Sequence, residues 1–177
     1  SGLPFELGII RSHYVGRTFI QPSDGARHSG VRRKHNANRG LVEGKRIVLI
    51  DDSIVRGTTS KKIVEMMRDA GATEVHFRVA SPPTAHSCYY GVDTPERSSL
   101  LAAQMEIEPM REFINADSLA FISIDGLYRA VGRKARNNAC PQFCDACFTG
   151  DYPTRLTDLS RREDGAAQLS FPVNKVA

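Results

Sequence analysis

The stretch from Arg46 to Val79 restricts the fold more than any other part of the chain. It starts with a short apolar run, Ile47–Ile50, which is typical of a strand buried on both faces of a parallel sheet. Apolar residues then recur at the spacing of an amphipathic helix, at Ile63, Met66, Met67 and Ala70. Alternating apolar residues at Val75, Phe77 and Val79 predict a second strand. This strand–helix–strand pattern predicts an α/β fold with a parallel sheet and flanking helices.

Weaker signals predict the remaining elements. Thr59 or Ser60 is expected to cap the helix, and Gly71 to end it. The other elements expected are a strand at Arg17–Gln21, a long loop at Pro22–Gly44, helices from Thr94-Pro95 to Gln104 and from Pro109 to Asn115, a strand at Leu119–Ser123 and a turn of helix at Gly126–Gly132. The 177 residues suit one domain with an appendage, which we place at 1–135 and 136–177, the latter ending in a weakly ordered tail.

The loop that follows the first strand, Asp51–Ser60, carries the chemistry. Ligands of open α/β sheets bind at the carboxyl ends of the strands, which is where this loop lies. The pair Asp51 and Asp52 can hold Mg²⁺ through water or bond the hydroxyls of a ribose. The small residues Gly57–Ser60 lead into a helix N-terminus, which favours a phosphate. No Walker A string is present, and the simpler alternative is an Asp-rich turn that caps a helix.

Positive charge is concentrated in one segment. The chain has a net charge of +4, yet Arg27–Arg46 alone holds seven basic residues against the single acid Glu43. Such a patch indicates an anionic partner, either a phosphorylated metabolite, a nucleic acid or a membrane surface. A solvated basic loop is the equally simple alternative.

The cysteines are unevenly placed, with Cys88 alone and Cys140, Cys144 and Cys147 close together. The Cys144-x-x-Cys147 spacing suits zinc or an iron–sulfur cluster, and free thiols are the alternative. No apolar run is long enough to cross a membrane and no secretory leader is visible, so we expect a cytoplasmic protein without a membrane partner. With 41% hydrophobic and 25% charged residues, the composition is that of a globular protein rather than a disordered one.

Long strings of sequence resemble a known family. Val48–Thr59 is similar to the phosphoribosyl pyrophosphate (PRPP) motif of type I phosphoribosyltransferases. The flanking strings Gly8–Ile20, Gly30–Lys34, Ser81–Pro83 and Cys147–Gly150 resemble the amidophosphoribosyltransferase family within that group. The similarity extends from about Ser1 to Pro153 and implies the type I phosphoribosyltransferase fold. Ser1-Gly2 matches the family at an interior point, which implies a C-terminal fragment without the glutaminase domain and with an incomplete phosphoribosyltransferase domain.

The resemblance implies a reaction and a set of roles. Ammonia released from glutamine attacks C1 of PRPP, pyrophosphate leaves, and 5-phosphoribosylamine forms as the first committed step of purine synthesis. Asp51 and Asp52 would bind the ribose hydroxyls and Mg²⁺. The PRPP-binding loop would comprise Asp51, Asp52, Ser53, Ile54, Val55, Arg56, Gly57, Thr58, Thr59 and Ser60, with Arg56–Ser60 on the 5′-phosphate. Arg17 and Lys34 would act near the pyrophosphate, with Lys34 on a loop that closes over PRPP. Tyr14 would help to link the PRPP site to the site that releases ammonia from glutamine.

The resemblance also implies cofactors and partners. Some members carry a [4Fe–4S] cluster, and Cys88, Cys144 and Cys147 match three of its ligands. The fourth family ligand lies upstream of this chain, and Cys140 is extra. Purine nucleotides would act as inhibitors, and the family forms homo-oligomers.

A second class of function is a PRPP-sensing regulator of the same fold that binds nucleic acid. Nucleic-acid footprints usually add aromatic residues or a basic helix to the charge. The basic segment contains neither Phe, Tyr nor Trp and has no helical period, so we expect no nucleic-acid partner.

Overall fold

A computed structural model of the chain describes residues 2–11 and 35–156. Strands β3 (Arg46–Asp51), β4 (Glu74–Val79) and β5 (Ser118–Phe121) form a parallel sheet in that order. The register pairs Ile47 with Val75 and Phe77 with Leu119. The predicted α/β fold with a parallel sheet is therefore confirmed, as are both strands around the first helix.

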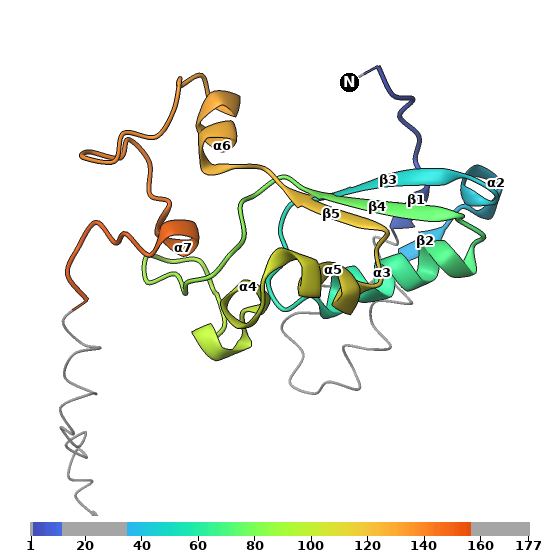
Figure 1. Cartoon of the computed structure of the whole chain (residues 1–177), viewed down its shortest axis with the longest axis horizontal. Helices are drawn as coiled ribbons and strands as arrows, with labels where there is room; N and C mark the ends of the chain where they lie inside the picture. The colour runs from blue at the N-terminus through green and yellow to red at the C-terminus, as the bar shows by residue number, and fades with distance from the viewer. Residues whose placement is uncertain (1, 12–34, 157–177) are drawn as a thin grey trace, which may run out of the picture.

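Apart from α2 (Arg39–Val42), which lies at the amino end of β3, the helices lie on one face of the sheet or beyond its carboxyl ends (Figure 1). Helix α3 (Thr58–Asp69) connects β3 to β4, and α4 (Leu101–Gln104) and α5 (Ile107–Ile114) precede β5. A 3₁₀ turn at Arg97–Ser99 comes before α4. Helices α6 (Ile124–Ala130) and α7 (Ala146–Thr149) follow β5. Among the residues described, no helix has the length and apolar character needed to cross a membrane.

The core forms between the sheet and α3 because one face of each is apolar. Val75, Phe77 and Val79 alternate with polar residues along β4 and are at most 4% exposed. The same core cluster contains Val64 and Met67 of α3 and Met110 and Ile114 of α5. Burial of these side chains supplies the hydrophobic stabilisation of the unit.

The opposite face of the sheet is open in the described structure, so the prediction that β3 is buried on both faces was wrong. Val48 is 47% exposed and Ile50 69% exposed on this face. Their strand neighbours are polar, and Arg78 donates to the Ser118 hydroxyl at 2.9 Å. The apolar run in β3 predicts the fold class correctly. The helices described here, however, cover only the face that bears Ile47 and Leu49.

A small antiparallel pair was missed by the sequence patterns. Strand β1 (Ile9–Arg11) pairs with β2 (His35–Ala37), and helix α2 (Arg39–Val42) follows. The expectation of one loop over Pro22–Gly44 was therefore wrong for its described part, because elements of three or four residues are too short to show a period. The rest of that loop, the strand expected at Arg17–Gln21 and residues 157–177 lie outside the described residues.

Helix boundaries also shifted. Gly57, with φ +73°, precedes α3 and neither Thr59 nor Ser60 caps it, because both lie inside the helix. Thr94-Pro95 does not begin a helix, and α5 begins at Ile107, which places Pro109 in the first turn where its missing N–H costs nothing. Gly71 ends α3 as predicted, with φ +96° and its N–H bonded to the Arg68 carbonyl.

Candidate functional site

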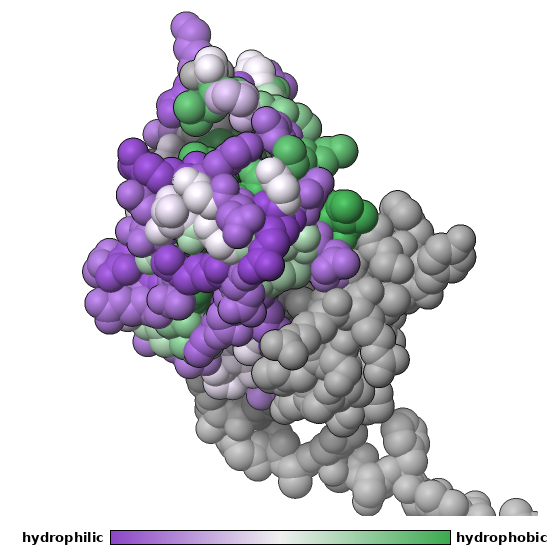
Figure 2. All heavy atoms as spheres, turned by 90° about the vertical axis from the view of Figure 1, so that its right-hand side faces the viewer, coloured by the Kyte–Doolittle hydropathy of each residue, from purple (hydrophilic) through white to green (hydrophobic). Residues whose placement is uncertain are grey.

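The two adjacent carboxylates lie at the carboxyl end of β3. Asp51 pairs with Val79, and its carbonyl accepts the Ala80 N–H at 2.9 Å, so its backbone is fixed by the sheet. The Asp52 N–H donates to Asp51 Oδ1 and the Ser53 hydroxyl donates to Asp52 Oδ1, both at 3.0 Å. The predicted acidic pair is thus brought together and held by the strand and the start of the loop. The carboxyl end of β3 points away from the face shown in Figure 2, whose described surface is mostly hydrophilic.

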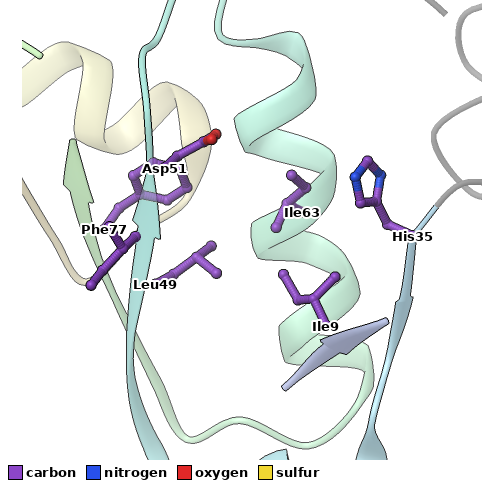
Figure 3. Close-up of a pocket in the computed structure, with 7 residues that line it drawn as sticks. Ile9, His35, Leu49, Asp51, Ile63 and Phe77 are labelled. Atoms are coloured by element: carbon purple, nitrogen blue, oxygen red, sulfur yellow. The ribbon is translucent and has the colours of Figure 1, made fainter. Parts of the chain in front are cut away.

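Asp51 faces a pocket between β3, α3 and the β1–β2 pair (Figure 3). The pocket has a volume of about 150 Å³, and its other lining residues are Ile9, His35, Leu49, Ile50, Ile63 and Phe77. Burial raises the pKa of Asp51; the Asp52 N–H opposes this rise, and the neighbouring Asp52 charge adds to it. An ionised Asp51 is therefore costly without a partner. A divalent cation or a pair of ligand hydroxyls would offset that cost.

The loop after the acidic pair is anchored by the helices beneath it. Ile54 is only 2% exposed, and the Val55 carbonyl accepts the Leu101 N–H at 2.8 Å. Gly57 packs so closely that an added Cβ would lie 2.6 Å from Leu101 Cδ2 and 3.0 Å from Phe113 Cε1. The loop therefore has a fixed shape, set by α4 and α5.

The N-terminus of α3 is suited to an anion. Thr58 is exposed, Thr59 is half-buried, and no side chain caps the helix. The first backbone N–H groups of a helix have no partner within it, and the dipole adds partial positive charge there. Exposed Arg56 lies directly before this turn. Together these groups can bind a phosphate whose sugar hydroxyls reach Asp51 and Asp52.

Three predicted residues, Tyr14, Arg17 and Lys34, lie outside the described residues. His35 comes directly after Lys34 and lines the pocket opposite Asp51 (Figure 3). Sequence reasoning missed His35 because the segment around it has no period and its contact with the pocket depends on the pairing of β2 with β1.

The cysteines come together from two distant segments. Cys88 lies on the loop after β4, whereas Cys144 and Cys147 flank the start of α7. The N–H groups of Ala85 and His86 donate to the Cys147 carbonyl at 3.1 and 3.0 Å. Burial raises the pKa of the Cys147 thiol, and the nearby Cys88 and Cys144 raise it further. Cys140 is exposed.

Cysteine thiolates are the ligands that iron–sulfur clusters use, but a [4Fe–4S] cluster needs four of them and only three cysteines match its ligand positions. The Tyr90 N–H donates to Cys88 Sγ at 3.4 Å, a bond that stabilises a sulfur ligand. Within residues 2–11 and 35–156, no three His, Cys, Asp or Glu side chains are grouped closely enough to bind one metal ion. The structure therefore brings Cys88 and Cys144 into the neighbourhood of Cys147, but it does not arrange the three thiols as a metal site.

A buried ion pair near these cysteines carried no sequence signal. Arg136 donates to Asp145 from Nε at 2.6 Å and from Nη2 at 3.1 Å, and the side chains are 11% and 5% exposed. Burial disfavours ionisation of Asp145, but the bonds from Arg136 and Tyr128 outweigh it and hold its pKa below the ordinary value. The two residues lie nine apart in an irregular segment, where no periodicity pairs them.

Comparison with known proteins identifies close relatives, although no family model matches the chain. An amidophosphoribosyltransferase of Rhizobium etli is 64% identical over 166 residues, which is 93% of this chain and 34% of the relative. That of Bacillus subtilis is 56% identical over 156 residues, or 88% of this chain and 33% of the relative. A chloroplastic amidophosphoribosyltransferase of Arabidopsis thaliana is 54% identical over 165 residues, covering 93% and 28%. The chain thus spans about a third of the length of these relatives.

Solved structures agree. The glutamine PRPP amidotransferase of B. subtilis complexed with ADP and GMP superposes with a TM-score of 0.73 at 56% identity, covering 87% of this chain and 34% of that one. A structure described as the allosteric regulatory enzyme of purine biosynthesis gives 0.73 at 55% identity, covering 88% and 33%. The fold expected from the PRPP motif is confirmed.

Proposed function

Since this chain is homologous over most of its length to a third of the amidophosphoribosyltransferases, we propose that it supplies the PRPP-binding part of such an enzyme. The reaction joins ammonia from glutamine to C1 of PRPP and yields 5-phosphoribosylamine, glutamate and pyrophosphate. This is a glycosyl transfer and the first committed step of purine synthesis. The glutaminase part belongs to the remaining length of the relatives.

The observation that carries the proposal is the arrangement at the end of β3. The acidic pair (half-buried Asp51 and exposed Asp52), the anchored loop and the uncapped start of α3 follow one another within ten residues. In this proposal Asp51 and Asp52 bind the ribose hydroxyls and the waters of Mg²⁺, and Arg56–Ser60 bind the 5′-phosphate. Fixing the sugar at both ends holds C1 in place for attack by ammonia.

The displacement requires stabilisation of the leaving pyrophosphate rather than a covalent intermediate. Mg²⁺, when bound, supplies positive charge to the pyrophosphate oxygens. Arg17 and Lys34 would add charge from the chain itself, with Lys34 on a loop that excludes water from the reacting centre on closing. Tyr14 would couple PRPP binding to ammonia delivery.

Cys88, Cys144 and Cys147 would supply three ligands of a [4Fe–4S] cluster in the longer protein, with the fourth from elsewhere. A cluster held this way would link the loop after β4 to the segment around α7. An iron and labile-sulfide assay on anaerobically purified full-length enzyme tests this part, and absence of both would refute it.

The remaining parts of the proposal concern assembly. A related enzyme is complexed with ADP and GMP, which supports purine nucleotides as inhibitors. We also propose a homo-oligomer, a cytoplasmic location, and a division of the chain near residue 135. The alternative of a nucleic-acid-binding regulator is not supported, because the relatives and solved structures above are amidophosphoribosyltransferases.

Calorimetric titration of the chain with PRPP in the presence of Mg²⁺ tests the acidic pair. Asp51→Asn should weaken binding about ten- to a hundredfold, the loss expected for one charge-assisted contact. Asp69→Asn is the matched control, because Asp69 is an exposed acid at the other end of α3. Unchanged affinity in Asp51→Asn would refute the assigned role. In the full-length enzyme, Lys34→Ala should reduce pyrophosphate release with little effect on stability.

A further inference from the structure

Lys61 lies one turn into α3, directly behind the turn that suits a phosphate. It is the fourth residue of the helix, and its backbone N–H donates to the Gly57 carbonyl at 2.9 Å. The N–H groups of Thr58–Ser60 precede this bond and have no partner within the helix. Side chains on a helix lean toward its N-terminus, so the Lys61 side chain leans toward these same N–H groups.

The ring of Phe113 lies against both Lys61 and the glycine that precedes the helix. Lys61 Nζ is 5.3 Å from the centroid of this ring, which makes a cation–π contact. A Cβ added to Gly57 would lie 3.0 Å from Phe113 Cε1 and 3.3 Å from Cδ1. Phe113 belongs to α5, which packs against α3. One aromatic side chain of a neighbouring helix therefore fixes the ammonium group beside the loop.

The charge of Lys61 is not balanced by the described part of the chain. Its ammonium group makes no ion pair with residues 2–11 or 35–156, Glu65 one turn further along α3 included. The first turn of α3 contains no acidic residue. A cation near a helix N-terminus adds to the partial positive charge of the dipole, which is unfavourable until an anion binds. Lys61 therefore has the charge and the place of a phosphate ligand.

We propose that Lys61 binds the 5′-phosphate of PRPP and that Phe113 is the positioning residue that keeps its ammonium group beside Gly57. This inference rests on the proposed function, in which Arg56–Ser60 bind that phosphate. It adds a side chain from the body of the helix to the set. Apart from Arg56, the donors of this turn are neutral, so Lys61 supplies a second full positive charge to the phosphate.

Calorimetric titration of the 177-residue chain with PRPP and Mg²⁺ tests the role of Lys61. Lys62→Gln is the matched control for Lys61→Gln, because it removes the same charge from the next residue of the helix. Lys61→Gln should weaken PRPP binding about fivefold or more, and Lys62→Gln should stay within about twofold of the unaltered chain. Lys61→Arg keeps the charge and the contact with the ring, so it should bind like the unaltered chain. Ribose 5-phosphate should be weakened by the same factor as PRPP, because it carries the 5′-phosphate without the pyrophosphate.

A double-mutant cycle tests the role of Phe113. Phe113→Leu should weaken PRPP binding on its own but cost less than about twofold once Lys61 is Gln. Phe113→Tyr keeps the ring and should retain the affinity. Independent losses at the two positions would overturn the role of Phe113. Denaturant unfolding shows whether each variant is folded, and if Phe113→Leu is not, the comparison of Lys61→Gln with Lys62→Gln decides.

The outcomes separate this inference from the proposed function. Equal PRPP affinity in Lys61→Gln and Lys62→Gln would overturn the role of Lys61, and so would a loss for PRPP without one for ribose 5-phosphate. Either result leaves the acidic pair in place as long as Asp51→Asn weakens PRPP binding. If the unaltered chain does not bind PRPP, or Asp51→Asn binds it equally well, the proposed function fails and this inference with it.

Discussion

Replacing Gly57 with alanine should distort the loop that leads into α3, and the structure separates two reasons. The first is backbone conformation: Gly57 has φ +73°, which costs an alanine about 1 kcal/mol. The second is space, because the new Cβ would lie 2.6 Å from Leu101 Cδ2 and 3.0 Å from Phe113 Cε1. Leu101 is itself only 4% exposed, so it has little freedom to move away. Overpacking of this kind costs about 1–3 kcal/mol.

Gly44 provides the matched control. It has φ +72°, and a Cβ added there would meet nothing within 4 Å. Gly44→Ala should therefore lose only the backbone cost of about 1 kcal/mol, while Gly57→Ala loses about 2–4 kcal/mol in total. Denaturant unfolding of the two variants and the unaltered chain measures the difference.

A double-mutant cycle identifies the contact responsible. Leu101→Ala removes the methyl group nearest the added Cβ, so the combined variant should be more stable than the sum of the single changes predicts, by about 1 kcal/mol or more. Equal losses of stability in Gly57→Ala and Gly44→Ala, with no coupling to Leu101, would refute the idea that α4 shapes the phosphate loop. PRPP titration of Gly57→Ala under native conditions then shows whether loop shape also determines affinity.

Further predictions concern the acids and the sheet. Burial raises the pKa of Asp51, so its ionised form opposes folding and the stability of the chain rises as the pH falls toward that pKa. Asp51→Asn should therefore raise the denaturant midpoint of unfolding at neutral pH, and a lower midpoint would contradict this. The Val75 N–H and Arg68 lower the pKa of Asp117. The stability that ionised Asp117 contributes is therefore present above about pH 4 and is lost as the pH falls through its lower folded pKa. Asp117→Asn should cost about 1 kcal/mol of stability at neutral pH and flatten the acid limb of a stability–pH curve. Phe77→Ala should cost about 3–5 kcal/mol in denaturant unfolding, whereas Ile50→Ala on the open face should stay within about 0.5 kcal/mol, and a large loss at Ile50 would mean that this face is covered in the isolated chain.

The parts of the fold that the sequence predicts are those with many repeats of one signal. The helix residues Ile63–Ala70 and the alternation along β4 each provide several matches to one period, and both elements are confirmed. The sequence placed the acidic pair correctly at the carboxyl end of β3, because predicting a strand also predicts where it ends. Its role in binding PRPP stays a prediction.

The parts that were missed depend on partners far away in the chain. Strand β2 exists because His35–Ala37 pairs with Ile9–Arg11, and neither strand has a pattern of its own. The cap of α3 was assigned to hydroxyl residues, but Gly57 takes that position because Leu101 and Phe113 leave no room for a side chain. The bond between Arg136 and Asp145 depends on how α6 packs against the segment that leads into α7, which local sequence does not describe.

The strand order of the parallel sheet also bears on how the chain folds during synthesis. Spatial neighbours in this sheet are consecutive in sequence, with β3 and β4 separated by 28 residues at Arg46 and Glu74, and β4 and β5 by 42 at His76 and Ser118. A ribosome delivers the strands in the order in which they add to one edge, so each pairing can form as soon as the next strand emerges. Between the emergence of Val79 and that of Ser118, the edge of β4 is unpaired. An unpaired strand edge is a template for pairing with other chains, so we expect the nascent chain to be most prone to aggregation in that interval.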